Sequence, residues 1–252
     1  MKISYQDSIV AFVDVLGFSR IVYGSDKSHI EAYFTYVVDD LKGQVGSTGF
    51  QYLLISDAIV VSAPNTLTNL TGLVKLLSKI QAKLLSRGIL TRGGIASGDL
   101  HVDRDSSVVV GPGLIRAYEL ERAANYPRII IDRRFIPLYQ TGTQRLIAEF
   151  GEWLACDDVE KYADGAIYIN YPRYVVIHNT FYLNNRMADI LAMFKEEYYG
   201  NEHFAKYDWL LRHLVIQFTR SLDEGALQSN QTRQTKTKLR KIRDVLPRFS
   251  EL

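Results

Sequence analysis

Two short apolar runs that each lead to an aspartate stand out in the pattern of hydrophobic and polar positions. Residues 9–13 (IVAFV) precede Asp14, and residues 50–54 (FQYLL) lead through Ile55 and Ser56 to Asp57. Apolar, β-favouring runs of four to eight residues between polar or glycine boundaries are typical of buried strands. The pattern therefore predicts a strand ending at Asp14 and a tight β-hairpin with Asp57 at its tip, continued by residues 58–61.

Between and after these strands, apolar residues recur with helical or strand periodicity. Helical spacing predicts helices at 28–41, 66–86 and 114–124, and strand patterns lie at 89–97, 106–110 and 128–132, with a polar turn at 98–105. The order is β-α-β-β-α-β-β-α-β. It predicts an α+β sandwich of ferredoxin-like type, with the helices on one side of the sheet.

The remainder of the chain has a different character. Its patterns predict strands at 150–156 and 164–171 and helices at 179–199, 204–221 and 231–245. We therefore divide the chain into a domain of residues 1–175 and a C-terminal helical appendage of residues 176–252. The last helix carries the basic residues Arg233, Lys236, Lys238, Arg240, Lys241 and Arg243. This patch could touch nucleic acid, but without interleaved aromatic residues a solvated helix face is favoured, and no nucleic-acid partner is expected.

Composition narrows the functional classes. The chain has 252 residues, is 47% hydrophobic and carries a formal net charge of +2, so it has material for a sizeable core and no global attraction to nucleic acid or membrane. Its single cysteine, Cys156, excludes an internal disulfide. No apolar stretch approaches the roughly 20 residues of a bilayer span, and the N-terminus lacks a signal-peptide pattern. We expect a cytoplasmic protein with no membrane partner.

The two aspartates are the candidate chemical groups. A carboxylate at the end of an apolar strand is costly to bury unless a cation or hydrogen-bond donors meet it. If strand pairing brings Asp14 and Asp57 together, they form an oxygen-rich site suited to Mg²⁺ or Mn²⁺, the hard cations that accompany nucleotide phosphates. The structural alternative is that each aspartate only caps a turn. Their matching places at strand ends favour the metal site.

This framework resembles the catalytic domain of class III nucleotidyl cyclases, and in detail the pyrimidine cyclases of the bacterial antiphage system called Pycsar. The resemblance covers residues 8–132 well and the rest weakly. The segments that carry it are 12–18 (FVDVLGF), 56–58 (SDA), 92–98 (RGGIASG), 111–113 (GPG), 117–121 (AYELE), 126–132 (YPRIIID) and 206–210 (KYDWL).

The resemblance implies a metal-dependent intramolecular reaction. The ribose 3′-oxygen of a nucleoside triphosphate attacks the α-phosphorus, and pyrophosphate leaves. Asp14 and Asp57 would be the catalytic residues and would bridge two divalent cations, Mn²⁺ or Mg²⁺, with Val15 as a further metal ligand.

It also implies the substrate contacts. Backbone N–H groups at the turn formed by Leu16, Gly17 and Phe18 would cradle the phosphates. Arg92 would contact phosphate or the transition state, and Arg116 and Arg122 are weaker candidates for the same role. The resembling enzymes work as head-to-tail homodimers with sites at the interface.

Departures from the purine-specific pattern indicate the base. Leu53 stands where adenylate cyclases carry the base-recognition lysine, and Ile115 and Glu119 occupy the positions of the Asn and the transition-state Arg. Neighbouring Gln51 and Tyr52 offer an amide and a phenol that could read a pyrimidine edge. We expect a uridylate cyclase that makes cyclic UMP as an antiviral second messenger for a separate effector protein.

Two alternatives remain open. The enzyme could use CTP and make cyclic CMP. A different class of function is a catalytically inactive cyclase-homology dimer that binds a nucleotide as a sensor, although two retained metal carboxylates favour the enzyme.

Overall fold

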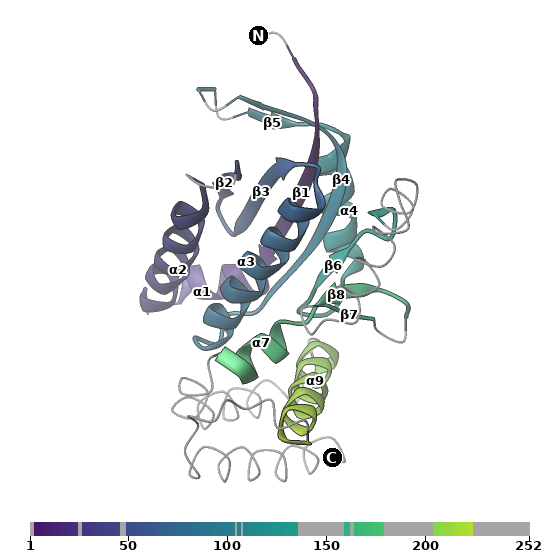
Figure 1. Ribbon diagram of the computed structural model, residues 1–252. Helices are drawn as coiled ribbons and strands as arrows, with labels where there is room; N and C mark the ends of the chain where they lie inside the picture. Colours follow the sequence, from purple (N-terminus) through teal and green to yellow (C-terminus); the bar gives the residue numbers. More distant parts are fainter. Residues whose placement is uncertain are drawn as a thin grey trace, which may run out of the picture.

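The computed structural model describes residues 3–24, 27–45, 49–103, 105–106, 108–135, 159–161, 164–178 and 204–223, and their fold is mixed α+β (Figure 1). In chain order the elements are β1 (Gln6–Val15), α1 (Phe18–Tyr23), α2 (Ser28–Val45), β2 (Gln51–Ile55), β3 (Ala58–Pro64), α3 (Leu67–Leu85), β4 (Thr91–Asp103), β5 (Val108–Val110), α4 (Pro112–Ala123), β6 (Ile129–Ile131), β7 (Val159–Lys161), β8 (Ile167–Ile169), α7 (Tyr171–His178) and α9 (Phe204–Asp223). The predicted order through β6 is confirmed, with the short helix α1 added.

Strand β1 lies inside the sheet, between two neighbouring strands. The strands of the sheet lie in the order β2-β3-β1-β4-β6-β8-β7, and β5 pairs with β4 outside this series. Strand β1 pairs antiparallel with β3 on one side and with β4 on the other, whereas β4 and β6 are parallel. A central strand is covered on both faces, which explains why residues 9–13 form an unbroken apolar run rather than an alternating one.

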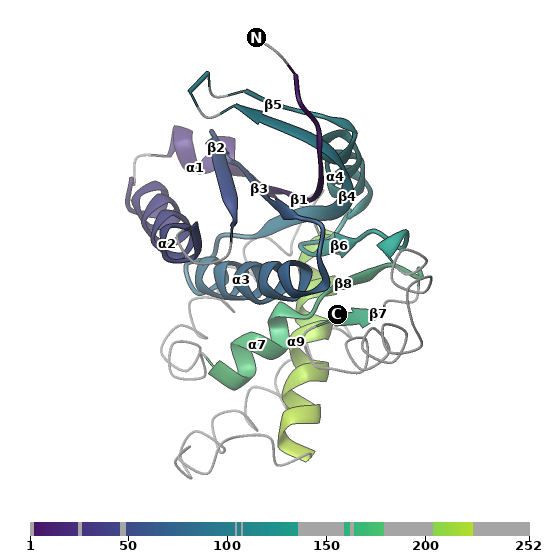
Figure 2. The same ribbon diagram turned by 45° about the horizontal axis from the view of Figure 1, so that its top comes forward.

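Helices cover both faces of the sheet, so the prediction that they lie on one side is wrong (Figure 2). Ile9, Ala11 and Val13 of β1 belong to the main core with residues of α2 and α3, while Val10 and Phe12 pack with α4 in a second cluster. The cause is strand alternation: both faces of β1 are apolar, and each needs a cover.

Two further predicted elements are confirmed closely. Helix α3 begins after Thr66, whose side chain accepts a hydrogen bond from the Asn69 N–H at 3.2 Å. In the hairpin, Ile55 pairs with Ala58, so Ser56 and Asp57 alone form the turn. The pattern of the sequence thus places Asp57 at the tip correctly.

The predicted polar turn at 98–105 is wrong over residues 98–103. Strand β4 continues through Gly98 to Asp103 and pairs there with β5. Leu100 is buried in this extension, and a Cβ at Gly98 would lie 2.9 Å from the Gly113 nitrogen at the start of α4. Contact with α4 and pairing with β5 therefore keep an otherwise turn-like segment extended.

The C-terminal part is described in pieces. The predicted helix at 204–221 is confirmed as α9, and the predicted strand at 164–171 contains β8, whose last residue Ile169 is followed closely by α7. The predicted segments 150–156, 179–199 and 231–245 lie outside the described residues. Trp209 and Leu210 of α9 belong to the main core. The domain boundary at residue 175 stays a prediction.

None of the helices in the described ranges has both the length and the apolar composition that crossing a bilayer requires.

Helix α4 touches the backbone of β4, which generates a stability prediction. A Cβ at Gly94 would lie 2.4 Å from both the Ala117 carbonyl oxygen and the Leu120 Cβ. Gly94→Ala should therefore displace α4 and lower the free energy of unfolding by about 1–3 kcal/mol, as overpacking does. Gly43→Ala, at an exposed position in α2 with open space around it, is the matched control and should raise stability by up to about 1 kcal/mol. Urea unfolding measures both, and a Gly94→Ala protein as stable as the wild type would contradict the prediction.

Candidate active site

The structure brings Asp14 and Asp57 together, as the strand pattern predicts. Val13 of β1 pairs with Ile59 of β3, so Asp14 lies beside the start of β3 and next to the hairpin tip. The pKa of Asp14 is raised to about 6, first by burial and then by the charges of Asp57 and Glu121, while Arg92 acts in the opposite direction. The Asp14 and Asp57 side chains are also close enough to share a hydrogen bond. The charge of Asp57 thus disfavours ionisation of Asp14.

The hairpin tip is held in place by a buried tyrosine. Ser56 has a φ of 56°, in the left-handed region that favours glycine, so the turn needs external support. The Tyr33 hydroxyl of α2 donates a hydrogen bond to the Asp57 carbonyl oxygen at 3.1 Å, and the Tyr33 ring packs edge-on against Phe18. Burial, with the charges of Asp57 and Asp14, raises the pKa of Tyr33, which keeps the hydroxyl protonated as a donor. Sequence reasoning missed Tyr33 because its only signal was one apolar position in a helix.

Arg92 and Glu121 form the wall of the site on the α4 side. Arg92 is opposite Asp14 in the β1–β4 register, and its Nη2 lies 3.8 Å from the Asp14 carboxylate. Its Nε makes a closer ion pair with Glu121 of α4, whose side chain is only 3% exposed. Arg92 is therefore engaged mainly by Glu121 and leaves Asp14 only partly compensated. Glu121 was not predicted as a site residue, and only its place in the segment 117–121 pointed to it.

The turn after Asp14 was predicted to bind metal and phosphate, and the structure bears on this prediction at one of its residues. Val15 is buried in the main core, and the Leu16 N–H donates to the Leu90 carbonyl at 2.8 Å. The Leu16 N–H is therefore used by the sheet and is not free to cradle phosphate, which corrects that prediction. Gly17 has a φ of 72° and open space around it, so it is needed for its backbone conformation. Metal ligation by Val15 and phosphate binding at Gly17 and Phe18 stay predictions.

The predicted base readers lie away from the aspartates of the same chain. Gln51 is four residues before Ile55, which places it about 13 Å from the hairpin tip at 3.3 Å per residue. Leu53 packs in the cluster on the α4 face, whereas Tyr52 packs against the main core on the opposite face. Within one chain, Arg92 therefore lies beside the aspartates, whereas Gln51 and Tyr52 do not.

The positions that depart from the purine pattern are occupied by side chains with other roles. Ile115 on α4 is 60% exposed. Glu119 accepts a hydrogen bond from Arg116 Nη1 at 3.2 Å, and Arg116 Nε donates to the buried Asp132 at 3.0 Å. Arg116 is thus paired with two carboxylates, and Arg122 is exposed on the same helix. Neither Ile115 nor Glu119 supplies a free guanidinium beside Asp14.

The donor set of the aspartate pair fits a hard divalent cation. A cation between two neighbouring carboxylates relieves the repulsion of their charges, and oxygen donors suit Mg²⁺ and Mn²⁺. In the part of the chain that the structure describes, no group of three or more His, Cys, Asp or Glu residues could hold a metal ion.

Comparison with solved structures finds nucleotidyl cyclase domains. The chain is similar to the monomeric guanylyl cyclase domain of the RhoGC fusion protein from Blastocladiella emersonii (14% identity, 67% of this chain and 98% of that one, TM-score 0.45). It is also similar to the guanylate cyclase domain of RhGC from Catenaria anguillulae in complex with GTP (16% identity, 65% and 94%, TM-score 0.45). A third is the adenylate/guanylate cyclase/hydrolase from Silicibacter pomeroyi (12% identity, 67% and 96%, TM-score 0.46). No protein-family model and no curated protein matches the chain.

The raised pKa of Asp14 predicts a pH dependence of stability. The folded-state pKa of about 6 exceeds the ordinary 3.8, so the folded protein binds more protons than the unfolded chain between these values. Stability contributed by protonated Asp14 is therefore lost as the pH rises from about 4 to about 6. Asp14→Asn should recover on the order of 2–3 kcal/mol at pH 7 and little at pH 4.

Urea unfolding in EDTA at the two pH values measures this difference, and the pH 4 comparison is the internal control. Mn²⁺ should stabilise the wild type at pH 7 more than the Asp14→Asn protein. An equal effect of the substitution at both pH values would contradict the prediction.

The position of Glu121 beside Arg92 leads to a second electrostatic prediction, which concerns the pKa of Asp14. Glu121→Gln removes a negative charge that raises the Asp14 pKa and releases Arg92, which lies within reach of Asp14 and lowers that pKa. The Asp14 pKa should therefore fall below about 6. Carbon-13 NMR titration of the Asp14 carboxyl measures it, with Glu119→Gln on the outer part of the same helix as the control. A titration midpoint for Asp14 that stays in place in Glu121→Gln would show that Arg92 does not respond to Glu121.

Proposed function

We propose that the chain is a nucleotidyl cyclase that converts a nucleoside triphosphate into a 3′,5′-cyclic nucleotide and pyrophosphate. The observation that carries the proposal is the pair of aspartates at the end of the sheet, held together although the charge of Asp57 raises the pKa of Asp14. The residue pattern of segments 12–18 and 56–58 supports it, since it resembles that of class III cyclases. When bound, divalent cations would lower the pKa of the ribose 3′-hydroxyl and neutralise triphosphate charge.

The protein's own residues prepare this site in three ways. Asp14 and Asp57 provide the carboxylate oxygens that hold the cations. Tyr33 fixes the backbone of the hairpin tip through its hydrogen bond to the Asp57 carbonyl. Glu121 makes the closer ion pair with Arg92, so that the guanidinium compensates the Asp14 carboxylate only in part. The reaction needs no side-chain nucleophile, because the attacking oxygen belongs to the substrate.

The substrate that we propose is a pyrimidine triphosphate, with UTP before CTP. Leu53 is apolar and packs in the α4-face cluster, so it cannot read adenine through a charge. Glu119 puts a carboxylate where a purine cyclase places its transition-state Arg, and that carboxylate is bonded to Arg116. The product would be cyclic UMP, made as an antiphage second messenger and read by a separate effector protein.

A homodimer follows from the same proposal. Gln51 lies about 13 Å along β2 from the hairpin tip, a separation that the strand geometry fixes. It can serve as a base reader for the aspartates only from a second copy of the chain.

The second candidate function is a nucleotide sensor without catalysis. The observation that favours it is the pairing of Arg116 with Asp132 and Glu119, which leaves no guanidinium at the transition-state position of α4. Product formation separates the two functions.

The decisive experiment incubates the purified protein with each of the four ribonucleoside triphosphates and Mn²⁺ and identifies cyclic products by chromatography and mass. We expect cyclic UMP in greatest yield. Asp57→Ala should abolish turnover without lowering the melting temperature, because it relieves the repulsion with Asp14. Asp39→Ala, an exposed aspartate of α2, is the control and should keep full activity. Preferential cyclisation of ATP would overturn the pyrimidine assignment, and nucleotide binding without any cyclic product would favour the sensor.

A further inference from the structure

Arg128, directly before β6, is a buried cation at the far end of α4. Its side chain is only 1% exposed, which is costly for a guanidinium unless partners compensate its charge. Its Nη2 atom lies 2.5 Å from the Asp164 carboxylate, and its Nε donates a hydrogen bond to the Ala124 carbonyl oxygen at 3.0 Å. Arg128 therefore joins the turn before β8 to the last turn of α4.

Three aromatic rings enclose this guanidinium. Its central carbon lies 5.0 Å from the ring centroid of Tyr126 and 5.9 Å from those of Tyr168 and Trp209. Trp209 stacks on Tyr126 at an interplanar angle of 9° and meets Tyr168 edge-on. Aromatic faces attract a desolvated cation. Trp209 belongs to α9, so a helix from the C-terminal part of the chain completes the surroundings of Arg128 (Figure 1).

Arg128 is connected to Arg92 from two sides. Its backbone carbonyl accepts a hydrogen bond at 3.0 Å from the N–H of Gly93, the neighbour of Arg92 on β4. Its side chain holds Ala124, whose N–H donates to the Glu121 carbonyl oxygen one turn earlier in α4. Glu121 carries the carboxylate that pairs with Arg92 Nε. One residue thus ties together the strand and the helix turn that meet in the Arg92–Glu121 ion pair.

The end of α4 depends on this tie. A helix leaves its last carbonyl groups without partners inside the helix, and a cation at that end also complements the helix dipole. The chain turns away at once, because Asn125 has a φ of 55° in the left-handed region. The Ala124 carbonyl oxygen is therefore held by the Tyr126 N–H and by Arg128 Nε. Without the guanidinium, the turn that carries Glu121 loses its side-chain link to β6.

We propose that Arg128 is a positioning residue for the Arg92–Glu121 ion pair and that docking of α9 keeps it in this position. With Trp209 in place, the guanidinium is held between Asp164 and Ala124, and the ion pair stays closed. Without α9 in this place, water reaches Arg128, the last turn of α4 loosens, and Arg92 turns to Asp14. The consequence for cation binding at Asp14 rests on the proposed function, whereas the consequence for Arg92 does not.

The first experiment follows the Nε–Hε group of Arg92 by nitrogen-15 NMR and measures how fast its proton exchanges with solvent. Trp209→Leu keeps an apolar side chain in α9 but opens the aromatic enclosure, so exchange should become at least about fivefold faster. Arg128→Lys keeps the charge, but an ammonium offers its donors from one point and cannot span Ala124 and Asp164. It should also speed the exchange, an effect that a role of the charge alone would not produce.

A milder variant tests the same link without emptying the core. Asp164→Asn keeps the shape of a side chain that is 43% exposed and removes the charge that holds Arg128 Nη2. Exchange at Arg92 should become faster here too. Asp208→Asn is the matched control, because Asp208 lies next to Trp209 on α9 but pairs with Arg212 on the same helix. It should leave the exchange at Arg92 unchanged.

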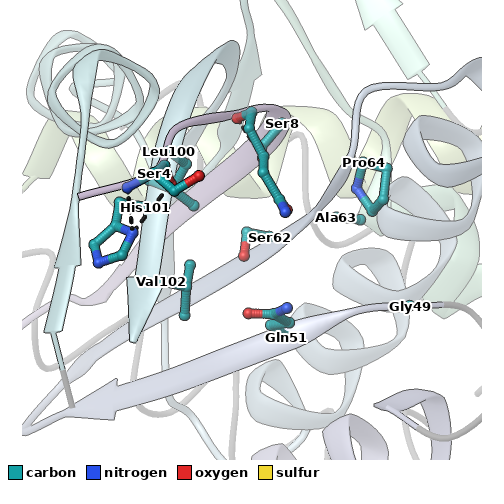
Figure 3. Close-up of a pocket in the computed structure, with 11 residues that line it drawn as sticks. Ser4, Ser8, Gly49, Gln51, Ser62, Ala63, Pro64, Leu100, His101 and Val102 are labelled. Atoms are coloured by element: carbon teal, nitrogen blue, oxygen red, sulfur yellow. Dashed lines mark hydrogen bonds between the residues drawn. The ribbon is translucent and has the colours of Figure 1, made fainter. Parts of the chain in front are cut away.

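Two further controls test whether a loss of stability by itself affects Arg92. Leu214→Ala removes a buried side chain of α9 five residues after Trp209, about 140° around the helix at 3.6 residues per turn. Val102→Ala lies on the same strand as Arg92, about 33 Å along β4 at 3.3 Å per residue, where it lines a hollow at the other end of the sheet (Figure 3). Both should leave the exchange at Arg92 unchanged.

The second experiment measures Mn²⁺ binding from the electron paramagnetic resonance of the free ion, without nucleotide. Trp209→Leu and Asp164→Asn should weaken binding by about two- to fivefold, because the released Arg92 competes with the cation for Asp14. A wild-type protein that does not bind Mn²⁺ would refute the proposed cation site. The exchange at Arg92 would then still decide whether Arg128 is a positioning residue.

Two results would overturn the role of Arg128. One is unchanged exchange at Arg92 in Trp209→Leu, Arg128→Lys and Asp164→Asn, with circular dichroism showing the proteins folded. The other is equally fast exchange in Leu214→Ala, which would show that Arg92 follows the stability of the whole fold. If Trp209→Leu or Arg128→Lys does not fold, the comparison of Asp164→Asn with Asp208→Asn decides.

Discussion

The direct contact between α4 and the backbone of β4 determines the geometry of the site. Gly94, Gly98 and Gly113 lack the Cβ atoms that would hold the helix and the strand apart. The close approach places Glu121 on Arg92 and sets the Tyr118 ring edge-on against Phe12, with centroids 5.4 Å apart. Because α4 covers this face of β1, Asp14 loses water on one side. A helix placed further out would leave Asp14 hydrated and Arg92 free to neutralise it.

The direction of the Asp14 pKa differs from that of a carboxylate whose ion pairs stabilise the fold. Asp132 is the comparison within the same molecule: burial raises its pKa, but hydrogen bonds from Arg134 and Arg116 lower it more, so its net pKa lies below the ordinary value. Asp14 also has an arginine nearby, yet its pKa is raised, because Glu121 engages that arginine and Asp57 adds a second negative charge. A carboxylate kept for stability would have the arrangement of Asp132. The arrangement of Asp14 opposes folding at neutral pH and suits a bound cation.

Features that depend on residues close together in the sequence could be predicted. Features that depend on residues far apart in the sequence could not. Asp14 at a strand end and Asp57 at a two-residue turn follow from local apolar runs and their boundaries. The extension of β4 could not be predicted, because Gly98 and Asp99 look like a turn until Gly113 and β5 are in place. Tyr33 and Glu121 were missed for a similar reason, since each lies in a regular helix and acquires its role only through a partner on another element. The placement of helices on both faces is likewise a property of the assembled sheet.

The rigidity of the sheet constrains how the two ends of the α4 face can cooperate. The distance from Gln51 to the hairpin tip is set by strand rise, so no side-chain rotation brings Gln51 to the aspartates of the same chain. Any substrate that uses both must therefore bridge two copies. Val110, Ile115 and Tyr118 lie exposed on β5 and α4, at 38%, 60% and 45%, and give this face apolar surface for such a contact.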